Sequence, residues 1–313
     1  MTKPKKSITI PIDGSKNALK AIDYLALMLG PEHDVKIHLC YILPSLPLIF
    51  DDEKHMTREE RTRKRSIEKK NVETAERIMA EARSILMDKG FSGEHVETLY
   101  QEKNMSITRD VCFLANRGRS DVILLTRHGK TEVKNLFMGE VCRKFVEYCQ
   151  EVPLWIVGGT VHSKKVLVAV DASENSRRAV DHASFMLSGT DCPITVFHTQ
   201  RHVTRYVPME MLTAEPTLEK EWREKSGGEI ASCMEKYKTM LLEGGIEDHR
   251  ISIKVADGTR SAANDILAEA KAGDYGTIVM GRRGISRFKE LYMGSVTSKV
   301  LQQGHGVALW VIQ

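Results

Sequence analysis

Three glycines and a serine form the segment of this sequence that is best suited to bind a phosphate group. The apolar run 277–280 ends at Gly281, Gly284 follows, and nine residues then lead to Gly294 and Ser295. Glycines let backbone N–H groups approach a ligand, and a helix N-terminus offers unpaired N–H groups with a partial positive charge. The pattern therefore predicts a strand, a phosphate-binding loop and a helix that has Ser295 as its N-cap.

The chain repeats itself at an offset of 155 to 158 residues. Three pairs of segments match in the same order along the chain: 10–15 with 168–173, 136–139 with 291–294, and 152–157 with 307–312. A period of this length indicates two copies of one domain. We expect domain boundaries at 1–160 and 161–313, because glycines interrupt the apolar pattern near residue 158.

Strands and helices alternate in both copies. Copy one has helix starts at Ser15 and Ser106, and copy two has helical patterns at 175–187, 218–242 and 261–271. Strands that are apolar throughout predict an α/β fold with a parallel sheet covered on both faces. The expected strands are 7–12, 35–42, 96–100, 122–125 and 152–157 in copy one, and 165–170, 194–198, 250–255, 277–280 and 307–312 in copy two.

Composition describes an ordinary globular protein of two domains. The chain has 313 residues and a net charge of +4, which does not argue for nucleic acid as a partner. The basic run 61–65 is interleaved with glutamates, so a solvated helix face is expected there. Apolar runs stay below the roughly 18 residues of a membrane helix, so we expect no membrane partner and a cytoplasmic protein.

The cysteines carry no metal or disulfide pattern. The six cysteines are scattered without a Cys-x-x-Cys pair. Cys142 and Cys149 lie seven positions apart on one expected helix face, and we interpret them as small buried hydrophobic residues.

The spacing Gly-x2-Gly-x9-Gly-Ser resembles the ATP-binding signature of the universal stress protein family. The resemblance covers almost the whole chain as two adjacent domains. It implies, for each copy, a five-stranded parallel α/β sheet of the Rossmann-like, adenine-nucleotide alpha-hydrolase-like type. ATP-binding members hold the nucleotide across this sheet.

The resemblance also implies which residues of copy two would bind ATP. Asp171 would meet the nucleoside and contact Mg²⁺ only through the phosphates, although it is also a plausible helix-entry residue. Thr199 would lie beside adenine, where the family usually has valine. The matching positions are Ala169, Asp171, Thr199, Met280, Gly281, Gly284, Gly294, Ser295, Val296 and Thr297. Because ligands of parallel sheets bind where the strand order reverses, Asp171 should approach Gly281.

Copy one departs from the signature. Thr126 replaces the first glycine and Glu140 replaces the serine, while Asp13 and Tyr41 occupy the other matching places. A carboxylate near 4 Å from a phosphate costs about 4 kcal/mol at an effective dielectric of 20. We therefore do not expect copy one to bind ATP, and we interpret it as a structural or regulatory partner.

The function that this resemblance implies is an ATP-binding regulatory module of the stress response, without dedicated catalysis. Two alternatives stay open: a slow ATPase or phosphotransferase with Ser295 as acceptor, and a scaffold that needs no nucleotide. Arg282, Arg283 and Arg287 favour a phosphate-rich ligand or are surface residues. The segments 200–216 and 218–225 could close over the nucleotide.

The last strands of the two copies are expected to pair within the chain and to bury Trp155 and Trp310. The sequence leaves a homodimer of tandem chains open.

Overall fold

The computed structural model describes most of the chain: residues 6–31, 33–50, 52, 54–127, 139–200, 203, 207–215, 217–259, 261–284 and 293–313. The centres of both predicted phosphate loops, including Arg287, lie outside the described residues.

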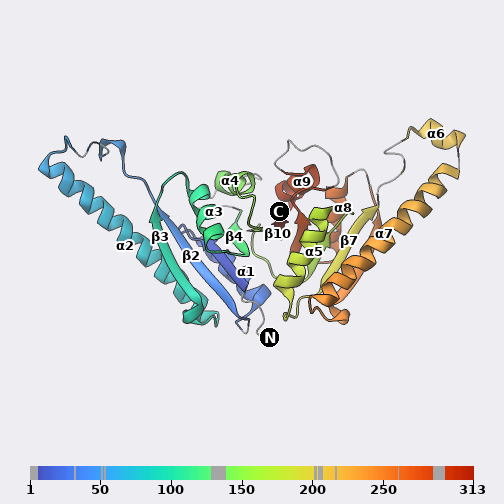
Figure 1. Cartoon of the computed structure of the whole chain (residues 1–313), viewed down its shortest axis with the longest axis horizontal. Helices are drawn as coiled ribbons and strands as arrows, with labels where there is room; N and C mark the ends of the chain where they lie inside the picture. The colour runs from blue at the N-terminus through green and yellow to red at the C-terminus, as the bar shows by residue number, and fades with distance from the viewer. Residues whose placement is uncertain are drawn as a thin grey trace.

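Ten strands form one continuous sheet, in the order β3-β2-β1-β4-β5-β10-β9-β6-β7-β8 (Figure 1). Within each copy all strand pairs are parallel, as predicted. Each half therefore has its switch point between its first and fourth strands. The strands are β1 Lys6–Pro11, β2 Val35–Leu43, β3 Val96–Glu102, β4 Val122–Thr126, β5 Leu154–Val157, β6 Val166–Ala169, β7 Ile194–Gln200, β8 Ile251–Asp257, β9 Thr277–Gly281 and β10 Ala308–Ile312.

Helices cover both faces of this sheet, which explains why the strands are apolar on both sides. One core layer lies under α1, α2, α5 and α7, and the other lies under α3, α4, α8 and α9. The helices are α1 Lys16–Leu29, α2 Arg58–Asp88, α3 Ile107–Arg117, α4 Glu140–Tyr148, α5 Glu174–Leu187, α6 Met209–Ala214, α7 Thr217–Glu243, α8 Ala262–Ala272 and α9 Ser295–Gln303. Helix α6 lies within the segment 200–216, one of the two segments considered for closure over the nucleotide.

Serine caps begin the same helices in both copies. The Ser15 and Ser173 side chains accept hydrogen bonds at the starts of α1 and α5. Ser106 and Ser261 do the same for α3 and α8. These caps satisfy N–H groups that a helix leaves unpaired, so equivalent helices begin at equivalent places.

The two copies join through their last strands. β5 and β10 pair antiparallel, with Trp155 opposite Trp310, and the two buried rings stack at 3.7 Å with an interplanar angle of 5°. Trp310 Nε1 donates to Tyr24 Oη at 2.7 Å, and Trp155 Nε1 donates to His182 Nε2 at 3.1 Å. Each tryptophan thus bonds to the first helix of the other copy, and the predicted pairing within the chain is confirmed.

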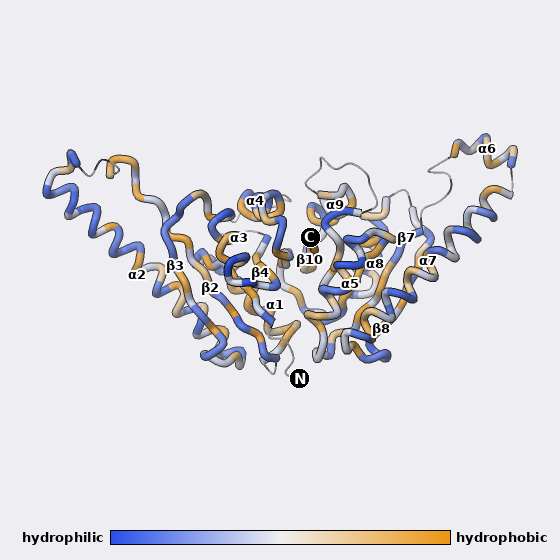
Figure 2. Tube along the Cα trace, in the orientation of Figure 1, coloured by the Kyte–Doolittle hydropathy of each residue, from blue (hydrophilic) through white to orange (hydrophobic). Residues whose placement is uncertain are grey.

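The long helices α2 and α7 lie at the two outer flanks of the molecule (Figure 1). The outer half of α2 is hydrophilic (Figure 2). Its charges pair one turn apart, as in Arg63–Glu59 at 3.8 Å and Lys69–Glu73 at 3.7 Å. This is the solvated helix that the interleaved charges predicted. Cys142 and Cys149 are buried, also as predicted. In the part of the chain that the structure describes, no helix is long and apolar enough to cross a membrane.

Candidate functional site

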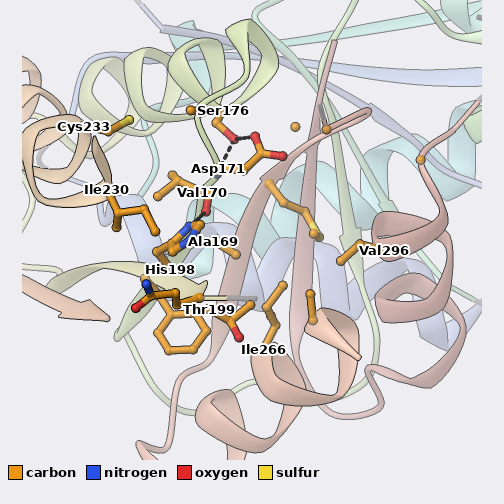
Figure 3. Close-up of a pocket in the computed structure, with 18 of the residues that line it drawn as sticks. Ala169, Val170, Asp171, Ser176, His198, Thr199, Ile230, Cys233, Ile266 and Val296 are labelled. Carbon is orange, nitrogen blue, oxygen red and sulfur yellow. Dashed lines mark hydrogen bonds between the residues drawn. The ribbon is translucent and has the colours of Figure 1, made fainter. Parts of the chain in front are cut away.

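A cavity of about 350 Å³ opens at the carboxyl ends of β6, β7 and β9 in copy two (Figure 3). All ten residues predicted for the site line it. Ile230 and Cys233 of α7 lie on one side, and Val296 of α9 lies on the opposite side (Figure 3). Met280 and Ala169, which are 5% and 6% exposed, contribute apolar lining. The cavity is within the roughly 300–1,000 Å³ range of small-molecule sites.

The carboxylate of Asp171 organises the turn after β6. Its Oδ1 accepts a hydrogen bond from Ser173 N at 3.0 Å and one from Ser176 Oγ at 2.7 Å. Its Oδ2 faces the glycine loop, because a Cβ added at Gly284 would lie 2.6 Å from it. Asp171 is thus both a helix-entry residue and a group beside the loop, and the expected convergence of the two loops is confirmed.

The glycines of the loop lie where side chains have little or no room. A Cβ at Gly281 would come within 2.8 Å of the backbone of Asn175 at the start of α5. A Cβ at Gly294 would lie 3.3 Å from both Arg282 O and the Cα of Arg283, which is close but tolerable. The backbone of the loop therefore packs directly against neighbouring segments of the protein. Glycine is suited to such positions because it has no Cβ.

The prediction that Ser295 is the N-cap of α9 is wrong. Gly294 is the N-cap, with φ −64° and ψ 148°, and no side chain accepts a cap hydrogen bond there. Ser298 N makes the first helical bond, to Gly294 O at 2.9 Å, so the three preceding N–H groups have no partner within the helix. Thr297 holds this turn in place because its hydroxyl donates to Gly281 O at 2.9 Å.

Two polar side chains lie at the end of β7. The hydroxyl of Thr199 donates to Asp265 Oδ2 at 2.8 Å, and Thr259 N donates to the same oxygen at 3.0 Å. His198 bonds through Nδ1 to Val170 O at 2.8 Å. Since a carbonyl only accepts, Nδ1 carries the proton in this contact.

Helix α7 supplies a wall of the cavity that the sequence did not reveal. Tyr237 Oη donates to Asp171 O at 2.8 Å, which joins α7 to the turn after β6. The α7 residues that line the cavity recur at the same helical spacing as residues that pack into a hydrophobic core. Their periodicity alone therefore could not assign them to a cavity. Trp222 is the one residue of this wall within the segment 218–225, for which closure over the nucleotide was considered from its position alone. The α7 residues that line the cavity are Trp222, Glu229, Ile230, Cys233, Met234 and Tyr237.

The arginines of the loop differ from one another. Arg282, expected near a phosphate or on the surface, is 4% exposed and reaches into copy one, where Nη1 donates to Cys149 O at 2.9 Å. Burial, followed by the charge of Arg283, lowers its pKa. Arg283 lines the cavity, and its buried Nε has no hydrogen-bond partner among the described residues.

Copy one has a different arrangement at the equivalent place. Glu140 pairs with Lys144 at 2.7 Å, and this hydrogen bond lowers the pKa of the Glu140 carboxyl, which is therefore charged. α2 lies directly on the turn after β1, because a Cβ at Gly14 would be 2.7 Å from Ile78 Cδ1. Within the described residues of either copy, no group of three His, Cys, Asp or Glu side chains is placed to hold a metal ion.

The fold and the cavity define a tandem α/β protein with a ligand crevice at a switch point of the sheet. Residues 5–158 and 162–306 match the Universal stress protein family, and the chain belongs to that family. Universal stress protein YxiE of Bacillus subtilis (strain 168) is 32% identical over an alignment of 147 positions that covers 44% of this chain and 91% of that protein. A solved universal stress protein from Archaeoglobus fulgidus DSM 4304 is 19% identical, with 99% of each chain covered and a TM-score of 0.64, which supports the fold.

Proposed function

We propose that the chain is an ATP-binding regulatory module of the stress response, and that copy two holds the nucleotide. The observation that carries this proposal is the N-terminus of α9, which lines the cavity without a side-chain cap. Its first N–H groups, which have no partner within the helix, and the positive end of the helix dipole favour a phosphate group at this place.

Three neighbouring features support the same ligand. Arg283 brings a cation to the cavity, and its Nε has no hydrogen-bond partner in the part of the chain that the structure describes. Gly284 and Gly294 line the cavity without a side chain that could keep a phosphate chain from the backbone. The apolar floor and the end of β7 suit a planar base, with Thr199 beside it. Asp171 Oδ2 faces the glycine loop, so Asp171 fits the role of contacting the nucleoside and of approaching Mg²⁺ only through the phosphates.

The same proposal assigns copy one a supporting role. The charged Glu140 stands at the start of α4, where copy two has Ser295, and its carboxylate would repel a phosphate. The division into domains 1–160 and 161–313 belongs to this proposal. Because β5 and β10 already pair within the chain, a homodimer of tandem chains would have to use another surface.

Calorimetric titration with ATP and Mg²⁺ tests the proposal, with Gly294→Asp and Gly139→Asp as matched variants. Both glycines are helix N-caps with a negative φ, −64° at Gly294 and −57° at Gly139, and aspartate is a preferred N-cap residue, so both proteins should fold. In Gly294→Asp the new carboxylate competes for the N–H groups of α9 and repels phosphate. We expect one site per chain in the wild type, a loss of about 100-fold or more in affinity in Gly294→Asp, and wild-type affinity in Gly139→Asp.

Two results would contradict this assignment. Two sites per chain would show that copy one binds nucleotide despite Glu140. No binding by folded, nucleotide-free wild-type protein would favour a scaffold that works without nucleotide.

A further inference from the structure

Arg282 belongs to the glycine loop of copy two, but its side chain contacts copy one. It follows Gly281 directly in sequence. Its Nη1 donates to Cys149 O at 2.9 Å, and its Nη2 donates to Val146 O at 2.5 Å. Both carbonyls lie at the C-terminal end of α4, where Cys149 is the C-cap. A residue of the loop therefore bonds across the joint between the copies.

The backbone of the same residue holds the two ends of the loop together. Arg282 N donates to Ile312 O at 2.6 Å, which ties the loop to β10. Arg282 O accepts a hydrogen bond from Gly294 N at 2.8 Å. Because Gly294 is the N-cap of α9, the position of Arg282 sets the position of the helix N-terminus that lines the cavity.

The chemistry of the contact favours a firm anchor. The last carbonyls of a helix lack partners within it and carry the negative end of the dipole, and a guanidinium offers five donors in a rigid plane. Gln313 completes the network, since its Oε1 accepts from Arg282 Nη1 at 2.8 Å and its Nε2 donates to Cys149 O at 3.1 Å. The guanidinium is buried, so water competes little for these bonds.

We propose that Arg282 is a positioning residue for the phosphate-binding loop, and that copy one supports the affinity of copy two for phosphate through it. The end of α4 fixes the guanidinium, and Arg282 in turn fixes Gly281, Gly284 and Gly294 in the arrangement that receives the phosphate chain. This inference rests on the proposed function. In the proposed arrangement the base would contact the end of β7 and the ribose the turn after β6, so we expect adenosine binding to depend little on Arg282.

Copy one supplies a matched control in Arg127. Its Nη1 donates to Gly304 O at 3.1 Å and its Nη2 donates to Gln302 O, at the C-terminal end of α9. Its backbone repeats the pattern of Arg282, with N bonded to Val157 O at 2.9 Å and O accepting from Gly139 N at 3.1 Å. The two arginines thus make reciprocal contacts across the joint, but the loop of Arg127 lacks the glycine and serine pattern.

The test compares Arg282→Gln with Arg127→Gln in the full chain, by calorimetric titration with MgATP and with adenosine and by urea unfolding. We expect Arg282→Gln to weaken ATP binding by about tenfold or more and to keep adenosine affinity within about twofold. Both variants should lower the urea concentration at the unfolding midpoint by similar amounts. Arg127→Gln should nevertheless keep ATP affinity within about twofold of the wild type. Wild-type ATP affinity in Arg282→Gln, or an equal loss in both variants, would overturn the proposal.

A gentler variant and a ligand-free measurement keep the test decisive. Gln313→Ala leaves the arginine in place and should weaken ATP binding by about threefold, again without a change for adenosine. Hydrogen exchange of a peptide spanning 277–284 should be faster in Arg282→Gln than in the wild type without any nucleotide. An unchanged exchange rate in Arg282→Gln would overturn the positioning role, whether or not the wild type binds ATP. If the wild type bound no ATP, that result would contradict the proposed function and not the positioning role.

Discussion

His182 shows how a single side chain is fixed by the joint between the copies. Its ring stands edge-on to both tryptophans, with centroids 6.1 Å from Trp155 and 5.9 Å from Trp310. Trp155 Nε1 donates to His182 Nε2, so this nitrogen must be unprotonated in the folded protein. Burial accordingly lowers the pKa of His182 from its ordinary value of 6.5 to about 3.

We predict that this histidine makes the free energy of unfolding fall as the pH falls below 6.5. A pKa that is lower in the folded state means that the unfolded chain binds the extra proton between pH 6.5 and about 3. Stability is therefore lost toward acid, with a slope of at most about 1.4 kcal/mol per pH unit from this group. Urea unfolding of the wild type and of His182→Gln between pH 7.5 and 5 measures the slope of the free energy of unfolding against pH. Glutamine can accept the indole N–H without titrating, so equal slopes in both proteins would contradict the prediction.

At the scale of elements, α7 decides the shape of the site. At the repeat offset of 155 residues, Ala82 of α2 is the position in copy one that is equivalent to Tyr237 of α7. Ala82 is 1% exposed in the core of copy one, whereas Tyr237 lines the cavity and bonds to the turn after β6. The larger residue reaches that turn with its hydroxyl and leaves space between α7 and β7 for a ligand.

Tyr237→Phe should lower the free energy of unfolding by about 1 kcal/mol, because one partly buried hydrogen bond is lost. It should also weaken ATP binding by about threefold, since the turn that carries Asp171 loses its tie to α7. Tyr275→Phe is the control: it removes the 2.9 Å bond to Thr195 Oγ1, which lies outside the cavity lining. An equal effect of both variants on ATP binding would show that the tie to Asp171 has no special role.

The elements also show what could be predicted from the sequence. Apolar strands, serine caps and the glycine spacing are local features, and the apolar strands correctly predicted the parallel sheet. The full set of ten residues that line one cavity was predicted only through the family resemblance, and their role in binding stays a prediction. The N-cap of α9 was misplaced by one residue, because Gly294 adopts the cap conformation without a side chain to indicate it. The contacts of Arg282 and the wall of α7 depend on how distant elements pack, and no local pattern encodes that.

At the scale of the whole molecule, the two copies share one sheet and are joined by hydrogen bonds and ring stacking as well as by strand pairing. Besides the stacked tryptophans, Tyr24 Oη hydrogen-bonds with Thr277 Oγ1 at 2.7 Å, and Lys6 Nζ donates to Ser188 O at 2.9 Å. These contacts come from the cores and edges of both copies. Unfolding one copy would expose the rings and the strand edge of the other.

We therefore predict that the chain unfolds in a single cooperative transition, with the same midpoint by tryptophan fluorescence and by far-ultraviolet circular dichroism. If copy two binds ATP, a nucleotide concentration of 100 times Kd should stabilise this whole transition by about 2.7 kcal/mol. Copies that unfold independently would instead give two transitions, of which ATP would shift only one. Gly294→Asp should abolish the shift and keep the single transition, which separates the coupling of the copies from the binding of the ligand.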